Sequence, residues 1–99
     1  MRMETHPEAA KEAQEAADYY EQCRTGLGYR FESAIETAGQ RILNNPYLHA
    51  EEDDGTRFGA VDGFPYSIIY EIHSDKIWIA AIAHQRRRPG YWKARQPSR

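Results

Sequence analysis

Apolar residues recur at every third or fourth position through the first half of the chain, a spacing that predicts amphipathic helices. In the first helix this apolar stripe consists of Ala9, Ala13, Ala16, Tyr20 and Cys23. In the second helix, expected from about Tyr29 to Asn44, it consists of Phe31, Ala34 or Ile35, Ala38 and Ile42. Gly26-Leu27-Gly28 interrupts the pattern, because glycine readily adopts the left-handed backbone that ends a helix. The first half therefore predicts a helical hairpin.

Local signals indicate where these helices begin and end. Thr5-His6-Pro7-Glu8 has the spacing of a capping box with proline in the first turn, so we expect the first helix to start there. Asn45-Pro46 ends the second helix, because the residue before a proline avoids the helical region. Glu8, Glu12 and Glu15 are expected on the outer face and in the first turns, where the helix dipole favours anions.

The second half is organised as strands. Runs rich in β-branched and aromatic residues predict strands over 56–61, 64–72 and 76–83, with a hairpin turn at Asp62-Gly63. Residues 76–83 are the most apolar stretch, so we expect this strand in the middle of the sheet, buried on both faces. Residues 1–5 have the pattern of a short edge strand. The chain thus predicts an α+β fold, with the helical hairpin packed on a twisted, mainly antiparallel sheet of three or four strands.

Length and composition fit one small domain, residues 1–99. The chain has 40% hydrophobic and 28% charged residues, which excludes a disordered polymer. No apolar run approaches the roughly 20 residues that span a bilayer, and the N-terminus lacks the apolar core of a signal peptide. A single cysteine, Cys23, excludes an internal disulfide, and its place on the apolar stripe predicts a buried thiol. We therefore expect a cytoplasmic protein with no membrane partner.

Charge is distributed unevenly. Residues 84–99 carry a charge of +6 and no acid, whereas the other residues carry −8, within an overall charge of −2. A basic end on an acidic body indicates either an anionic partner for that end or a solvated tail. The histidines lie scattered without metal-binding spacing, and no phosphate-binding glycine loop follows a strand, so we expect neither a metal nor a cofactor.

The basic segment is also the candidate site. Residues 84–95 combine arginines, which bind phosphates bidentately, with the aromatic Tyr91 and Trp92 and with His84. Histidine as a residue type can transfer protons near neutral pH. This mixture suits RNA binding or metal-free RNA cleavage. It suits a protein-recognition surface equally well, because tryptophan, tyrosine and arginine dominate binding hot spots. A third interpretation is that Tyr91 and Trp92 fold back over the sheet edge and leave the arginines solvated.

The order of several short motifs resembles the RelE/ParE superfamily of toxins from bacterial type II toxin–antitoxin systems. These motifs are Ala17-Asp18-Tyr19-Tyr20, residues 26–31, Asn45-Pro46, Arg57-Phe58, Phe64-Pro65-Tyr66 and residues 83–92. The resemblance implies a helical hairpin on a twisted sheet and a cognate antitoxin that wraps and neutralises the toxin. It also implies one of two activities: RelE-like cleavage of messenger RNA on the ribosome without a metal, or ParE-like inhibition of DNA gyrase.

The resemblance favours the ParE-like branch. Arg86 matches the superfamily's arginine after the last strand, and Tyr91 or Trp92 falls near its C-terminal aromatic position, but Ser67 stands where RelE-like toxins carry a strand arginine. For a ParE-like toxin, our hypothesis is that Arg86, Arg87, Arg88, Tyr91 and Trp92 form part of the surface that binds the target, DNA gyrase. The alternative, a nuclease acting on the ribosome and its mRNA, would require Arg57, His84, Arg86 and Tyr91 to converge on one phosphate. The acidic body also argues against broad contact with ribosomal RNA.

Overall fold

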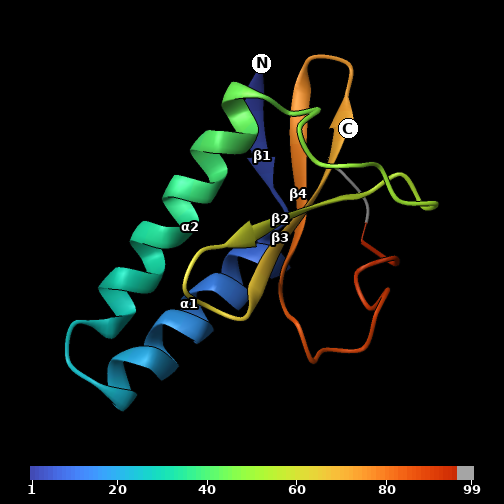
Figure 1. Cartoon of the computed structure of the whole chain (residues 1–99). Coiled ribbons are helices and arrows are strands. Elements are labelled where there is room, and N and C mark those ends of the chain that lie inside the picture. The colour runs from blue at the N-terminus through green and yellow to red at the C-terminus, as the bar shows by residue number, and fades with distance from the viewer. Residues whose placement is uncertain (96–99) are drawn as a thin grey trace.

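The computed structural model describes residues 1–95 and shows the strand–helix–helix–strand–strand–strand order that the sequence predicts (Figure 1). The elements are β1 (Arg2–Thr5), α1 (Pro7–Cys23), α2 (Leu27–Asn44), β2 (Arg57–Val61), β3 (Tyr66–His73) and β4 (Lys76–His84). In Figure 1 both helices lie on one side of the sheet and the segment after β4 lies on the other.

The sheet has four strands in the order β1-β4-β3-β2. The β2–β3 and β3–β4 pairs are antiparallel, whereas β1 lies parallel to β4, as a strand separated from its neighbour by a long crossover can. The sheet is therefore mixed, with a single parallel edge. β4 occupies an inner position, which confirms the placement predicted from its near-continuous apolar run.

Residues of β4 supply both faces of the sheet with core side chains. Those on the helix side are Ile77, Ile79 and Ile82, and those on the opposite side are Trp78, Ala80, Ala81 and Ala83. Phe31 of α2 packs into the helix-side core. Trp92, from the segment after β4, packs into the opposite core. The two faces of β4 are thus covered by different parts of the chain.

A bulge interrupts the pairing of β3 and β4. Ile69 lies opposite Ala81 and Tyr70 lies opposite Ile79, so Ala80 is an extra residue in β4. Such a residue lies outside the regular hydrogen-bond ladder and bends the strand. Here it changes which backbone groups of β4 face the neighbouring elements. One of these groups, the carbonyl of Ala80, belongs to the candidate site.

The two helices meet closely at their hairpin. A Cβ atom added to Gly28 would lie 2.6 Å from the carbonyl oxygen of Ala17, so this approach requires glycine. Glu21 of α1 accepts hydrogen bonds from the backbone N–H groups of Gly26 at 2.9 Å and Gly28 at 3.1 Å. These bonds satisfy amides at the start of α2, which begins at Leu27, two residues earlier than expected.

Two local expectations about α1 are wrong. His6, not Thr5, caps the helix, and its Nδ1 accepts the Glu8 N–H at 3.0 Å. Thr5 is unavailable because it pairs with Ile79 in the sheet. Cys23 is exposed rather than buried. Figure 1 shows the reason: the hairpin end of the helices projects beyond the sheet, where there is no core to cover the thiol.

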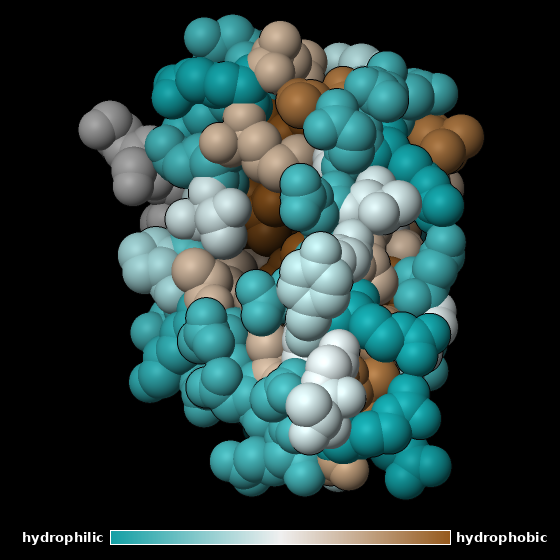
Figure 2. All heavy atoms as spheres, turned by 90° about the vertical axis from the view of Figure 1, so that its left-hand side faces the viewer, coloured by the Kyte–Doolittle hydropathy of each residue, from teal (hydrophilic) through white to brown (hydrophobic). Residues whose placement is uncertain are grey.

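The outer side of the helices is mainly polar. Figure 2 shows hydrophilic side chains over most of this face, with apolar atoms recessed between them. Ala10, Ala13 and Ile35 line a shallow groove between α1 and α2, which Glu32 and Glu36 flank. Both of these flanking charges are acidic, in contrast to the arginine-rich segment after β4.

Candidate functional site

The candidate site lies where β4 extends past the end of β1. β1 ends at Thr5, opposite Ile79, so within residues 1–95 the rest of β4 has no neighbouring strand on that side. α1 passes this edge, and Oε1 of Glu12 accepts a hydrogen bond from the N–H of Ile82 at 3.0 Å. A carboxylate thus occupies the place of the carbonyl that another strand would supply, which protects the edge from further pairing.

Glu12 also holds the segment that follows β4. Nη1 and Nη2 of Arg95 donate to Oε1 and Oε2 of Glu12 at 3.0 and 2.9 Å, and the hydroxyl of Tyr91 donates to Oε2 at 2.7 Å. Nη1 of Arg95 donates as well to the carbonyl of Ala80, the bulge residue, at 2.8 Å. The side chains of Glu12 and Arg95 are each only 13% exposed. The C-terminal segment is therefore fastened to α1 and β4 by a shielded ion pair.

The role of Glu12 corrects the expectation that it lies on the outer face of the first helix. Glu12 follows Ala9 by three positions and precedes Ala16 by four, and both alanines are buried. A carboxylate at that spacing lies on the buried side of the helix. This spacing was the signal in the sequence that Glu12 faces inward. Ala13, one position later, fits the same apolar stripe, so the stripe could be assigned without Glu12.

The network perturbs the titration of its members. Burial raises the pKa of Glu12, but hydrogen bonds from Arg95, Tyr91 and Ile82 lower it by more, so it lies below its ordinary value of 4.5. Burial, followed by the hydrogen bond to Glu12, raises the pKa of Tyr91. The hydrogen bond to Glu12 raises the pKa of Arg95. At neutral pH the site is therefore a carboxylate that accepts bonds from a phenol and a guanidinium.

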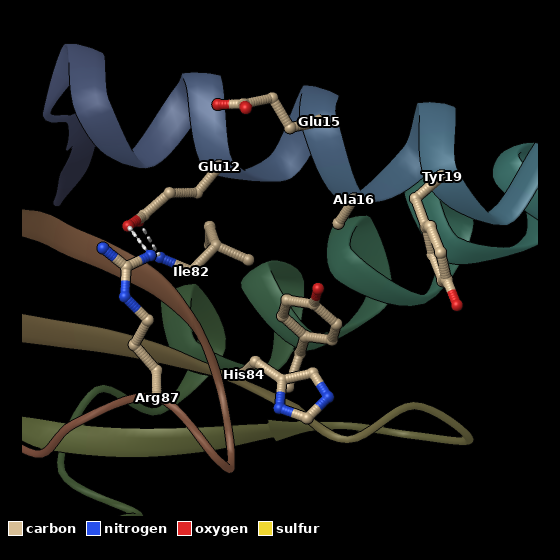
Figure 3. A pocket seen from close by; sticks show the side chains of 8 residues that line it. Glu12, Glu15, Ala16, Tyr19, Ile82, His84 and Arg87 are labelled. Carbon is tan, nitrogen blue, oxygen red and sulfur yellow. Dashed lines mark hydrogen bonds and ion pairs between the residues drawn. The ribbon is translucent and has the colours of Figure 1, made fainter.

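The three consecutive arginines lie at the surface beside this network. Arg86, Arg87 and Arg88 are all exposed. The guanidinium of Arg87 stacks 4.0 Å from the ring centre of Tyr91 and lies 3.8 Å from Oε2 of Glu12. Figure 3 shows Arg87 and His84 on the side opposite α1 of a hollow of about 220 Å³ between this helix and the end of β4. Arg87 is thus partly ordered, while its neighbours face solvent.

The aromatic residues of the segment, Tyr91 and Trp92, pack against the rest of the protein and offer little surface to a partner. Trp92 is 7% exposed and contacts Phe58 of β2 edge to face, with ring centres 5.6 Å apart. Tyr91 is half-buried and occupied by its bond to Glu12. This is the third of the sequence-based interpretations, in which Tyr91 and Trp92 fold back and the arginines stay solvated. The surface available to a partner is therefore mainly arginine.

The residues of the nuclease hypothesis do not converge. Arg57 lies on β2 with Nη1 bound to the carbonyl of His49 at 2.6 Å. The strand register places Val61 beside Tyr66 and Tyr66 beside His84, so Val61 is the residue of β2 that lies level with His84. Arg57 lies four residues before Val61, which is about 13 Å along β2. In addition, Nδ1 of His84 accepts the N–H of Arg86 at 3.0 Å. A single phosphate cannot contact this set without rearrangement of the chain.

Comparison with known proteins bears on the family and the fold of the chain. The sequence model for the ParE toxin of the type II toxin–antitoxin system parDE matches residues 3–89. The chain belongs to the ParE toxin family. The fold of this family member is similar to a solved chain described as the chromosomal ParDE TA system from P. aeruginosa, with a TM-score of 0.74 and 16% identity. That match covers 85% of this chain and 95% of the other. No curated protein matches the sequence.

The described part of this ParE-family structure has neither a metal-binding cluster of side chains nor a membrane-spanning helix. Among residues 1–95, no group of three or more histidine, cysteine, aspartate or glutamate side chains is placed to hold a metal ion. Within the same part of the chain, no helix is long and apolar enough to cross a membrane.

Proposed function

We propose that this ParE-family protein acts in the cytoplasm as the toxin of a type II pair and inhibits DNA gyrase by binding to it. We propose further that an antitoxin encoded beside it neutralises it, as the description of the similar P. aeruginosa structure, a ParDE system, suggests. The single observation that carries the choice of a binding mechanism is the separation of Arg57 from His84 and Arg86. Hydrolysis or transfer of a phosphodiester needs these groups within hydrogen-bond reach of one phosphate.

The exposed arginines support protein binding. Arg86, Arg87 and Arg88 follow a rigid central strand and are exposed. The fold anchors this segment at both ends, by β4 before it and by the Arg95–Glu12 pair after it. Because the backbone of the segment is anchored, binding to an acidic protein surface costs mainly side-chain entropy, and arginine is enriched among the residues that dominate such interfaces.

The first test is replacement of Arg86, Arg87 and Arg88 together by alanine. We expect the variant to lose growth inhibition, and inhibition of supercoiling by purified gyrase to weaken about tenfold or more, because hot-spot arginines often contribute over 1.4 kcal/mol each. The melting temperature should change little, since the side chains are exposed. A triple variant that remains fully toxic would show that this segment is not the target surface.

A matched control removes the same charge elsewhere. Lys11, Arg24 and Arg30 are exposed residues of the helical hairpin, away from the C-terminal segment. Their replacement by alanine should leave toxicity and gyrase inhibition unchanged. If both triple variants lose activity equally, the effect comes from net charge and not from a specific surface.

The order in which syntheses stop separates gyrase from the ribosome. After induction of the toxin alone, incorporation of labelled precursors into DNA should fall before incorporation into protein. If protein synthesis stops first, the proposed target is wrong, and mRNA cleavage by a rearranged set of Arg57, His84, Arg86 and Tyr91 becomes the function to test.

A further inference from the structure

A second hollow lies on the face of the sheet opposite the helices. It measures about 220 Å³ and lies under the segment that follows β4. Its walls include Phe58, Ile69, Ala83 and Trp92, and Ser67 lies among them. Ser67 contributes only a short side chain to this lining. The site at which the superfamily resemblance would place a phosphate-binding arginine is instead a mainly apolar hollow.

The hollow has the size and chemistry for one side chain. Small-molecule sites usually measure about 300–1,000 Å³, so this volume is too small for a drug-sized ligand or a nucleotide. The apolar walls offer few groups that could pair with the polar edge of a base. An aromatic or branched aliphatic side chain that enters the hollow would remove its apolar surface from water, which lowers the free energy.

Trp92, which forms one wall of the hollow, has a polar atom without a hydrogen-bond partner among the described residues. The indole Nε1 of Trp92 is buried and has no hydrogen-bond partner among the described residues. Buried donors in native assemblies nearly always have an acceptor. A partner that enters the hollow and shifts the ring slightly can supply one from its backbone or from a carboxylate. This orphaned donor is an observation independent of the shape of the hollow.

The rim of the hollow is cationic. Arg87 lines it, together with Gln85 and Pro89, and the exposed Arg86 and Arg88 adjoin it in the chain. None of the described residues that line the hollow is acidic. The C-terminal segment is positively charged, whereas the rest of the chain is negatively charged. The electrostatic potential near this hollow therefore favours an anionic partner.

From the apolar hollow, the orphaned indole donor and the arginine rim, we propose that this face is an anchor site for an acidic protein segment. The segment inserts one aromatic or branched aliphatic side chain between Phe58 and Trp92, while its flanking glutamates or aspartates contact the arginines. The inference concerns peptide recognition by this hollow and holds whether or not gyrase is the target. Nucleic acid is the alternative that the test is designed to detect.

The experiment titrates the full chain with a short synthetic peptide that has one phenylalanine flanked by glutamates. Two-dimensional NMR of the indole N–H groups reports the result, because the protein has two tryptophans and only Trp92 lines the hollow. We expect the Trp92 indole resonance to shift while that of Trp78 stays in place. A peptide with alanine in place of phenylalanine should bind about tenfold more weakly, since it lacks the anchor.

Two substitutions test the hollow itself. Ser67→Leu fills it, and Phe58→Ala removes a wall residue that is 40% exposed and therefore tolerant of change. Each should reduce peptide affinity about tenfold, while amide dispersion in the NMR spectrum shows that the variant is folded. Arg30→Glu, on the helical hairpin, is the charge control and should bind like the wild type.

Three outcomes would overturn the proposal. It is wrong if the Trp92 resonance stays fixed at saturating peptide, if folded Ser67→Leu binds as tightly as the wild type, or if a single-stranded RNA probe shifts the same resonance at lower concentration than the peptide. These results are separable from the gyrase test. Loss of peptide binding in a variant that stays fully toxic would leave the anchor site standing and remove it from the toxic mechanism.

Discussion

At the scale of single residues, Glu12 joins three parts of the protein. It receives hydrogen bonds from the backbone of β4, from Tyr91 and from Arg95, and its side chain is shielded from solvent. Removing one partner of such a pair leaves the other buried without compensation, which usually costs more than the pair contributes. Glu12 is therefore the residue at which a minimal change should affect the C-terminal segment most.

Glu12→Gln should lower the free energy of unfolding by about 2 kcal/mol at neutral pH, because a neutral amide forms weaker bonds to Arg95. The pKa of Glu12 lies below 4.5 in the folded state, so the unfolded state binds more protons as the pH falls through that range. The stabilisation from Glu12 is thus present above pH 4.5 and is lost below it. Urea denaturation at several pH values measures this.

The control for that prediction is Glu15→Gln, which changes an exposed carboxylate one turn further along α1. It should leave both the stability and its dependence on pH close to those of the wild type. If the Gln variants at positions 12 and 15 behave alike, the Arg95–Glu12 pair does not hold the segment.

At the scale of secondary-structure elements, β4 is the central strand on which the fold is built. It is buried on both faces and pairs with β1 on one side and β3 on the other. Its apolar run made this position predictable, because a strand with one wet face would alternate polar and apolar residues. The bulge at Ala80 was not predictable, because it depends on how β4 pairs with β3.

Ile82→Asp should unfold the domain or remove more than about 3 kcal/mol of stability, because it places an unpaired charge in the core between the sheet and the helices. Ile79→Asp should act in the same way, for the same reason. Circular dichroism melting of each variant measures the effect. The control is Ala60→Asp, at an exposed position of β2, which should melt nearly as the wild type does. A cooperatively melting, well-dispersed Ile82→Asp protein would contradict the placement of β4.

At the scale of the whole molecule, the sheet separates two surfaces of opposite character. The helices cover one face, where Glu32 and Glu36 flank a shallow groove, whereas the arginine-rich segment covers the other (Figure 1). The segment contributes one large buried side chain, Trp92, to the second core, where it packs with Trp78 and Ile69 of the sheet. The stability of the fold and the presentation of the arginines are therefore coupled.

Trp92→Ala should cost about 3–5 kcal/mol and expose Ile69 and Ala83, because a large core side chain is lost and the cavity cannot close. Calorimetry should show a lower melting temperature, and amide hydrogen exchange should accelerate in β3 and β4. Tyr47→Ala, at a residue that is 63% exposed, is the control and should have little effect. Unchanged stability of Trp92→Ala would show that the segment does not pack on the sheet.

The sequence by itself determined the elements, their order and the central place of β4, because hydrophobic periodicity and turn residues act within short stretches of chain. It also located the charged segment and, through motifs in a characteristic order, the family. Only the tertiary structure decided that Glu12 faces inward, that Trp92 is buried and that Arg57 lies far from His84. Each of these depends on contacts between residues distant in the chain, and a local pattern contains no distance between such residues.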